Sequence, residues 1–326
     1  MNRRVIYSCP FVPAEWIAAH GFRPSRIIPE SNAGEDVIGT RAGLCTYAHA
    51  FGNAVHTEEA CAIVVTTLCD QMRRLSEAIE LSESRPVFLL NVPHTWKTLN
   101  ARKLYASEVQ RLGRFLNELG GESPSDHKLA SSMSDFDKMR SELRALRGRL
   151  KPRQFSEIIA DFGIDTRIDF QSQTGTYVPR GIPLGLIGGP LLREHFRIFD
   201  LLEDCGGYVA LDGTETGERA FPAPFDRRRV CEDPFPTLID SYFDSIPDPA
   251  RTPNTRLYEW LRSAIDRRNL RGIILARHLG CDNWHAEVGR MRESLRIPFF
   301  DLDITGSFAD TPGKHTRLQA FMEMIR

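Results

Sequence analysis

The sequence predicts an α/β protein with two parallel-sheet units, and three observations lead to this prediction. Short apolar runs typical of buried strands alternate with helical patterns, as in βαβ units. These runs fall into two groups, and an almost entirely helical stretch lies between the groups. The length of 326 residues agrees with two domains of ordinary size.

The apolar runs give the predicted strands. The first group consists of Val5–Tyr7, Ala62–Thr66 and Val87–Leu90. The second group consists of Leu184–Ile187, Tyr208–Leu211, Gly272–Ala276 and Phe299–Leu302. Helical patterns follow most of these runs, so we expect the strands within each group to pair in parallel.

The helical stretch covers about residues 98–165. Apolar residues recur there at spacings of three and four, first over Leu104–Leu119 and then over Phe136–Leu150. Ser134 and Asp137 suggest a capping box at the start of the second of these helices. The stretch therefore predicts a helical segment between the two sheet-containing units.

The polar segment Gln171–Pro183 contains Gly and Pro and predicts the crossing between the two units. We therefore expect an N-terminal domain over residues 1–170, which includes the helical stretch, and a C-terminal domain over residues 171–326. An amphipathic pattern over Arg317–Arg326 predicts a helix that closes the chain.

Composition excludes several classes of protein. The net charge is −1 and the sequence pI is about 6.8, whereas bulk nucleic-acid binders usually carry a basic stripe. The N-terminus has no signal-peptide pattern, and no apolar run approaches the roughly 18 residues of a membrane span. We expect a cytoplasmic protein without a nucleic-acid or membrane partner.

The seven cysteines are an odd number and include no CxxC pair. Such a set disfavours a disulfide framework and a zinc ribbon, both of which need paired or regularly spaced cysteines. Most of these thiols are therefore expected to be reduced.

Three of the cysteines, Cys45, Cys69 and Cys281, lie where a helix is predicted to begin, two of them directly after an apolar run. The positive end of a helix dipole stabilises a thiolate, and ligands bind at the carboxyl ends of parallel strands. This placement suggests a metal or iron–sulfur centre with one coordination position left over. Their spacing matches no generic ligand pattern, so three buried thiols near loops remain the alternative.

Four further residues are candidates for a role near such a centre. Cys9 follows the first predicted strand and is a candidate second-sphere group or fourth ligand. His278 and His285 flank Cys281, and His49 follows Cys45 by four residues, so each is a candidate acid or hydrogen-bond donor to a cluster sulfur. For all four, an ordinary structural role is the alternative.

Nearly the whole chain resembles the 2-hydroxyacyl-CoA dehydratase D-component family, which includes the benzoyl-CoA reductase subunits. The resemblance rests on an ordered set of segments: PAEWIAAHGFRPSRI, GLCTYAHA, TTLCDQMRR, LLNVPHTW, YASEVQRL, LIGGPL, LEDCGGYVALDGTETGERAF, TPNTRL, GIILARHLGCDNW, RIPFFDLDITGS and TRLQAFMEMI.

The resemblance implies two Rossmann-like domains with a [4Fe–4S] cluster in the cleft between them. It implies that Cys45, Cys69 and Cys281 are the cluster ligands and that the fourth iron is open. One branch of the family carries a double cubane and needs three more cysteines in the segments matching LDGTETGERAF and SIPDPARTPNTRL. Both segments lack cysteine here, so a single cubane is expected.

The resemblance also implies a function. The chain is expected to be the iron–sulfur subunit of a lyase or reductase that performs one-electron, ketyl-radical chemistry on an acyl-CoA thioester. The implied partners are an ATP-dependent [4Fe–4S] activator protein and either a second family subunit or another copy of this chain. The basic segments Arg144–Arg153 and Arg227–Arg229 are candidate contacts for the phosphates of coenzyme A.

Two other readings stay open. One is an electron-transfer or accessory [4Fe–4S] protein without a thioester substrate. The other is a cluster-free partner subunit of a heterodimer.

Overall fold

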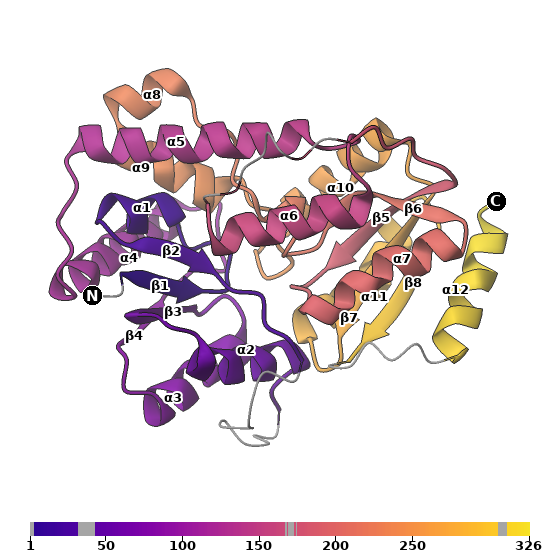
Figure 1. Cartoon of the computed structure of the whole chain (residues 1–326), viewed down its shortest axis with the longest axis horizontal. Coiled ribbons are helices and arrows are strands. Elements are labelled where there is room, and N and C mark those ends of the chain that lie inside the picture. Colours follow the sequence, from indigo (N-terminus) through magenta and orange to yellow (C-terminus); the bar gives the residue numbers. More distant parts are fainter. Residues whose placement is uncertain (1–2, 32–42, 167, 169–172, 174, 306–311) are drawn as a thin grey trace.

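The computed structural model describes residues 3–31, 43–166, 168, 173, 175–305 and 312–326. Two four-stranded parallel sheets form its centre (Figure 1). The first sheet has the order β2-β1-β3-β4 and the second has the order β6-β5-β7-β8. The strands are β1 (Arg4–Tyr7), β2 (Arg23–Arg26), β3 (Ala62–Thr66), β4 (Val87–Leu90), β5 (Ile182–Gly188), β6 (Gly207–Gly213), β7 (Gly272–His278) and β8 (Phe299–Ile304).

The two sheets share one topology. In each, the second strand in sequence lies outside the first, and the third and fourth follow on the other side. The central strands β3 and β7 are buried along their whole length, as expected where helices cover both faces of a parallel sheet. Their near-continuous apolar sequences, AIVVT and GIILA, are what such burial requires.

All seven predicted strands are present, and β2 is the strand that the sequence pattern missed. Its sequence, RPSR, is polar and contains Pro24. Proline is tolerated in a strand mainly at a sheet edge, and β2 is an edge strand. Its pairing is fixed by the neighbouring β1, with Arg4 opposite Arg23, rather than by apolar alternation.

Helices cover the sheets and lie between them (Figure 1). The α-helices are α1 (Ala14–Ala19), α2 (Thr46–Thr57), α3 (Asp70–Ser82), α4 (Leu99–Glu118), α5 (Asp126–Ala145), α6 (Pro152–Ile164), α7 (Arg197–Asp204), α8 (Arg227–Glu232), α9 (Pro234–Ile239), α10 (Thr255–Arg268), α11 (Asp282–Ser294) and α12 (Pro312–Met324). Three single-turn or irregular helices complete them: η1 (Arg193–Phe196), η2 (Glu218–Ala220) and η3 (Asp240–Asp244).

The helical stretch predicted over residues 98–165 is confirmed as α4, α5 and α6. The predicted capping box was wrong, because Ser134 and Asp137 lie inside α5. The true N-cap is Ser125, whose hydroxyl accepts a hydrogen bond from the Lys128 amide at 3.2 Å. The hydroxyl of Ser134 instead donates to the Ala130 carbonyl one turn earlier, a bond that serine also makes within helices.

The closing helix α12 begins at Pro312, before the predicted start at Arg317. Its buried residues Leu318, Phe321 and Met322 join the apolar core of the second sheet. Helix α12 is the yellow helix beside β8 in Figure 1.

A segment from the second half of the chain packs against the first sheet. Figure 1 shows α8 and α9 beside α5, and Phe225, Leu238 and Phe243 belong to the apolar core that contains Val5 of β1. The chain therefore crosses between the sheets more than once. The predicted boundary at residue 171 falls in a partly described stretch, so the division into residues 1–170 and 171–326 stays a prediction.

A buried ionic network fastens this segment to α1 and α5. Arg140 of α5 forms an ion pair with Glu15 of α1 at 2.5 Å, and both side chains are almost fully buried. The Tyr242 hydroxyl donates to the same carboxylate at 2.6 Å. Because an unpaired charge at this depth costs several kcal/mol, on the order of 3–5, the three groups hold the segments in one arrangement.

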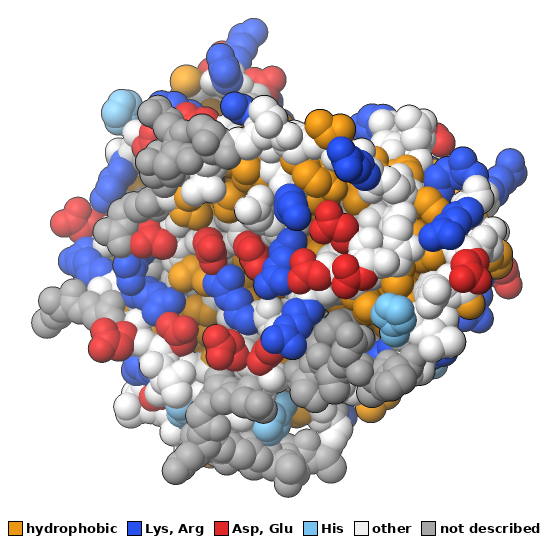
Figure 2. All heavy atoms as spheres, turned by 45° about the vertical axis from the view of Figure 1, so that its right-hand side comes forward, with side chains coloured by type: hydrophobic (Ala, Val, Ile, Leu, Met, Phe, Trp, Pro, Cys, Tyr) orange, Lys and Arg blue, Asp and Glu red, His pale blue; other side chains and the backbone are white. Residues whose placement is uncertain are grey.

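Acidic and basic side chains alternate over the face shown in Figure 2, in keeping with the net charge of −1. Within the described ranges, no helix combines the length and apolarity that a bilayer crossing demands.

Candidate metal centre

The carboxyl ends of both sheets border one small cavity. In a sheet of this strand order, the chain leaves the first and third strands toward opposite faces, which opens a crevice at their carboxyl ends. Ser8 and Thr66 bring the ends of β1 and β3 to the cavity, and Gly189 and His278 bring the ends of β5 and β7. The cavity therefore lies where the crevices of two sheets meet.

This cavity, of about 70 Å³, is lined by four cysteines: Cys9, Cys45, Cys69 and Cys281. The chain brings them together from positions up to 272 residues apart in sequence, counted from Cys9 to Cys281. The other three cysteines, Cys61, Cys205 and Cys231, are not among the residues that line it. That Cys45, Cys69 and Cys281 act as metal ligands stays a prediction.

Three of the four cysteines are the N-cap residues of helices. Cys45 caps α2, Cys69 caps α3 and Cys281 caps α11, and each has an extended backbone. The Ala48 amide donates a hydrogen bond to the sulfur of Cys45 at 3.5 Å. The backbone of Ala48, Met72 and Trp284, in the first turns of the three helices, lowers the pKa of the respective thiols, because these amides favour negative charge on sulfur.

Burial opposes this effect in the cavity. Desolvation raises the pKa of Cys69 to about 11 and that of Cys281 to about 12, and it raises the pKa of Cys45 as well. The backbone amides lower the pKa of each thiol, as the helix starts predict, but the loss of water raises it by more. A positively charged group in the cavity would favour the thiolates.

The chemistry of the donor set is compatible with an iron–sulfur cluster. Thiolates are the soft ligands that such clusters bind, and the three candidate cysteines line one cavity. Among the described residues, no group of three or more His, Cys, Asp or Glu side chains forms a ready site for a metal ion.

His278 is the one of the three candidate histidines that lines the cavity. Its Nε2 donates to the Pro190 carbonyl at 2.7 Å, whereas its Nδ1 has no hydrogen-bond partner among the described residues. Desolvation, assisted by the neighbouring His195, lowers the pKa of His278 to about 3. The ring is therefore a neutral imidazole with a buried acceptor nitrogen.

The structure does not bring His49 and His285 to the cavity. His49 is half-buried within α2, and His285 is exposed on α11. Each is four residues from a candidate ligand, but the N-cap cysteine has an extended backbone, so helical spacing does not align the two side chains. The sequence reasoning relied on that spacing.

Two carboxylates, Glu215 and Asp248, also line the cavity, and the sequence reasoning missed both. Both carboxylate oxygens of Asp248 accept hydrogen bonds, one from Arg219 at 2.9 Å and the other from the Ala250 amide at 2.9 Å. The Glu215 carboxylate is held more loosely, 3.6 Å from Arg26 and 4.0 Å from Arg219. Burial raises the pKa of Glu215, and both guanidinium groups oppose that rise.

A signal for Glu215 was present in the sequence. The segment DGTETGER directly follows a predicted strand, and polar residues after a parallel strand lie at the ligand-binding edge of the sheet. Asp248 offered no comparable signal, because it follows η3 and reaches the cavity through tertiary packing.

Comparisons with known proteins bear on this site. A similarity to a solved structure, the periplasmic zinc binding protein TroA from Treponema pallidum, has a TM-score of 0.26 at 12% identity. It covers 100% of this chain and 99% of that one, and a score this low carries no argument. The Escherichia coli (strain K12) protein named "Putative dehydratase subunit YjiM" is 22% identical over 290 residues, which are 81% of this chain and 74% of that protein.

The family comparison covers almost the whole chain. The sequence pattern of "2-hydroxyglutaryl-CoA dehydratase, D-component" matches residues 9–325, which include all four cysteines of the cavity. The resemblance inferred from the ordered segments is thereby confirmed, and this chain belongs to the 2-hydroxyglutaryl-CoA dehydratase D-component family.

Proposed function

We propose that this chain is the iron–sulfur subunit of a 2-hydroxyacyl-CoA dehydratase or a related acyl-CoA reductase. In this proposal Cys45, Cys69 and Cys281 hold a single [4Fe–4S] cluster, and the substrate is an acyl-CoA thioester. The observation that carries the proposal is that three helix N-cap cysteines from distant parts of the chain line one cavity between two sheets.

When bound, such a cluster supplies one electron at low potential to a thioester carbonyl. The protein's own residues create the surroundings that this chemistry needs. Leu68, Met72 and Trp284 form apolar parts of the cavity wall. A dry cavity strengthens every electrostatic interaction inside it and protects reactive species from side reactions.

One side chain in the cavity is suited to hold or move a proton, and a second is suited to accept a hydrogen bond. Glu215 offers a carboxylate that its arginine neighbours approach only at 3.6 and 4.0 Å. His278 offers the buried lone pair of Nδ1, which has no partner in the described part of the chain, and its lowered pKa keeps the ring neutral. Removing water from a 2-hydroxyacyl group needs proton transfer, and Glu215 is our candidate for it.

The proposal includes partners. One is an ATP-dependent [4Fe–4S] activator protein that delivers the electron. The other is a second family subunit or another copy of this chain, since a dehydratase subunit acts within a complex.

The test is to purify the protein without oxygen and to measure iron and sulfide per chain. We expect about four of each in the wild type. The Cys45→Ala variant should lose most of both, and the matched control Cys231→Ala should keep them, because Cys231 is an exposed cysteine. A well-folded wild type without iron would refute the cluster and favour a cluster-free partner subunit.

A second measurement separates the enzyme from an electron-transfer or accessory protein. The reduced cluster should give an electron paramagnetic resonance spectrum that changes when an acyl-CoA is added. A spectrum that no acyl-CoA alters would favour a protein that carries electrons without binding a thioester.

A further inference from the structure

The wall of the cysteine cavity contains one buried polar atom that the chain leaves without a partner. Among the described side chains that line the cavity, His278 supplies the only buried nitrogen or oxygen atom without a hydrogen bond, its Nδ1. The residue is 2% exposed, so bulk water does not reach this nitrogen. An unsatisfied buried acceptor is costly, and it therefore indicates a group that the folded chain binds at this point.

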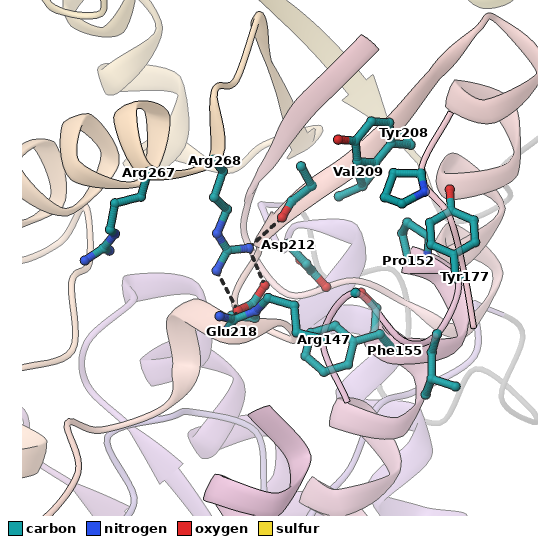
Figure 3. A pocket seen from close by; sticks show the side chains of 15 residues that line it. Arg147, Pro152, Phe155, Tyr177, Tyr208, Val209, Asp212, Glu218, Arg267 and Arg268 are labelled. Atoms are coloured by element: carbon teal, nitrogen blue, oxygen red, sulfur yellow. Dashed lines mark hydrogen bonds and ion pairs between the residues drawn. The ribbon is translucent and has the colours of Figure 1, made fainter. Parts of the chain in front are cut away.

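The larger hollow beside the edge strand β6, of about 480 Å³, differs in this respect (Figure 3). Two carboxylates line it, and both have partners within the chain. Glu218 accepts from Arg268 at 2.8 and 2.9 Å, and Asp212 accepts from the Thr214 hydroxyl at 2.7 Å and is also bonded by Ser156. These groups indicate no bound ligand, whereas the free nitrogen in the cysteine cavity does.

Hydrogen bonding fixes the tautomer of His278. Its Nε2 lies 2.7 Å from the Pro190 carbonyl, which can only accept, so the ring proton is on Nε2. Burial, assisted by the neighbouring His195, lowers the pKa of the ring to about 3. Near neutral pH the ring is therefore uncharged, and Nδ1 carries a free lone pair.

Two neighbouring rings hold this imidazole in place. The ring centroid of Tyr47 lies 5.9 Å from that of His278, and the centroid of His195 lies 5.2 Å from it. Both nitrogens of His195 are bonded, because Nδ1 accepts from the Leu192 amide at 3.2 Å and Nε2 donates to the Thr305 carbonyl at 2.7 Å. Of the two stacked histidines, His278 is thus the one with a lone pair to offer.

The candidate thiolate ligands lie close to the turn that follows His278. The Cys281 amide donates to the His278 carbonyl at 3.0 Å. Gly280 lies against Cys45, since a Cβ atom on Gly280 would be 3.8 Å from the Cα of Cys45. Desolvation raises the pKa of Cys281, and Cys45 and Cys69 raise it further, so the three thiols are within electrostatic reach of one another. One nitrogen donor and three sulfur donors therefore share the cavity.

The surroundings of His278 are those of a metal-bound histidine. Such a histidine usually donates its other ring proton to a backbone carbonyl or a carboxylate, as Nε2 does here to Pro190. Iron–sulfur clusters accept histidine in place of cysteine, as Rieske centres show. The other candidate fourth donor, Cys9, is already bonded by the Thr66 side chain and the Phe11 backbone.

We propose that Nδ1 of His278 is the fourth protein ligand of the cluster, beside Cys45, Cys69 and Cys281. This inference rests on the proposed function for the presence of the cluster. The family resemblance implies an open fourth iron, so a histidine at this position would set the chain apart from that expectation. A neutral imidazole also adds no negative charge to a cavity that already collects three thiolates.

The test is pulsed electron paramagnetic resonance of the reduced wild-type protein, purified without oxygen. One sample carries histidine labelled with ¹⁵N at Nδ1, and another carries histidine labelled at Nε2. A nitrogen bound directly to iron gives a strong hyperfine coupling, whereas a nitrogen across a hydrogen bond gives a weak one. We expect a strong coupling that changes its isotope pattern only with the Nδ1 label.

Variants assign this coupling to one residue. His278→Gln keeps a donor for the Pro190 carbonyl and should lose the coupling. The matched control His285→Gln, which replaces an exposed histidine of α11, should keep it. His278→Gln should also release iron faster than the control under mild oxidation, because one iron of its cluster has no protein ligand.

The outcomes separate this proposal from the proposed function. A wild type that holds iron and sulfide but shows no strong histidine coupling would overturn the ligation by His278 and leave the cluster in place. A coupling that persists in His278→Gln would also overturn it, because another histidine would then be the ligand. A wild type without iron would overturn the cluster and this ligand together. The labelled wild type decides the matter even if His278→Gln does not fold.

Discussion

The two sheets have the same strand order, yet they bring different chemistry to the cavity between them. In each sheet a cysteine follows the central strand by three residues: Cys69 after Thr66 of β3, and Cys281 after His278 of β7. The first strand of each sheet differs: Cys9 comes two residues after β1, and Pro190 comes two residues after β5. The shared topology thus places one cysteine from each sheet, Cys69 and Cys281, at equivalent positions. The residues that follow the first strands, Cys9 and Pro190, differ.

The ends of the central strands differ in a second way. Thr66 does not titrate near neutral pH, whereas His278 does in an unfolded chain. Cys45, the third candidate ligand, follows the edge strand β2 after a long connection, and its counterpart after β6 is the loop that carries Glu215. The equivalent cysteines thus follow from the shared topology, whereas the titratable residues His278 and Glu215 both come from the second sheet.

The largest predicted effect is on the free energy of unfolding and concerns Arg219, which bonds the ends of two strands of the second sheet. Arg219 is fully buried and donates to the carbonyls of Gly188 and Gly213, at the ends of β5 and β6, and to Asp248. Arg219→Met should lower the free energy of unfolding by about 3–5 kcal/mol, because Asp248 stays buried without its charged partner. Urea unfolding followed by circular dichroism measures this loss.

The matched control is Arg228→Met, since Arg228 forms an exposed pair with Glu232. We expect a change within about 0.5 kcal/mol there. An equal effect of the two substitutions would contradict the role of Arg219.

The next effect is a pH dependence that His278, at the end of a strand of the second sheet, should produce. The pKa of His278 is about 3 in the folded protein, against an ordinary value of 6.5, so the unfolded chain binds a proton first as the pH falls. The stability tied to the neutral ring is therefore complete above about pH 6.5 and is lost toward pH 3, by up to ~1.4 kcal/mol per pH unit. His278→Gln, which keeps a donor for the Pro190 carbonyl, should reduce this acid sensitivity.

The measurement is the unfolding midpoint at about pH 7.5 and at about pH 5, for the wild type and for His278→Gln. His285→Gln, which replaces an exposed histidine, is the control. The control should follow the wild type. An unchanged acid dependence in His278→Gln would show that other groups, such as the neighbouring His195, dominate it.

The smallest predicted effect is that of replacing Cys9, which follows the first strand of the first sheet. Cys9 has no sulfur counterpart in the second sheet, and we predict that Cys9→Ala keeps its iron and sulfide. Loss of one buried sulfur atom should cost about 1 kcal/mol of stability. Iron loss comparable to that of a ligand variant would instead make Cys9 a fourth ligand.

Much of the fold followed from the sequence, because buried parallel strands such as AIVVT and GIILA have a composition that little else shares. The polar edge strand RPSR could not be found in this way, since its neighbour β1 specifies it. The start of α5 was misplaced because Ser134 offered a second cap-like pattern within a helix that Ser125 already begins.

The residues of the candidate site were likewise only partly predictable from the sequence. Cys45, Cys69 and Cys281 were identified from helix starts and from the family resemblance, and the structure places all three on one cavity. Asp248 and the orientation of His278 depend on packing between segments far apart in sequence. His285 does not line the cavity, because helical spacing does not align its side chain with that of an extended N-cap residue.

The most direct test of the central claim is to measure iron and sulfide in two variants side by side, one from each sheet. Cys69→Ala and Cys281→Ala, purified without oxygen, should lose iron and sulfide to the same extent, because both residues occupy the same topological position around one cluster. If one variant keeps the wild-type content while the other loses it, or if the wild type itself binds no iron, the two sheets do not share a cluster.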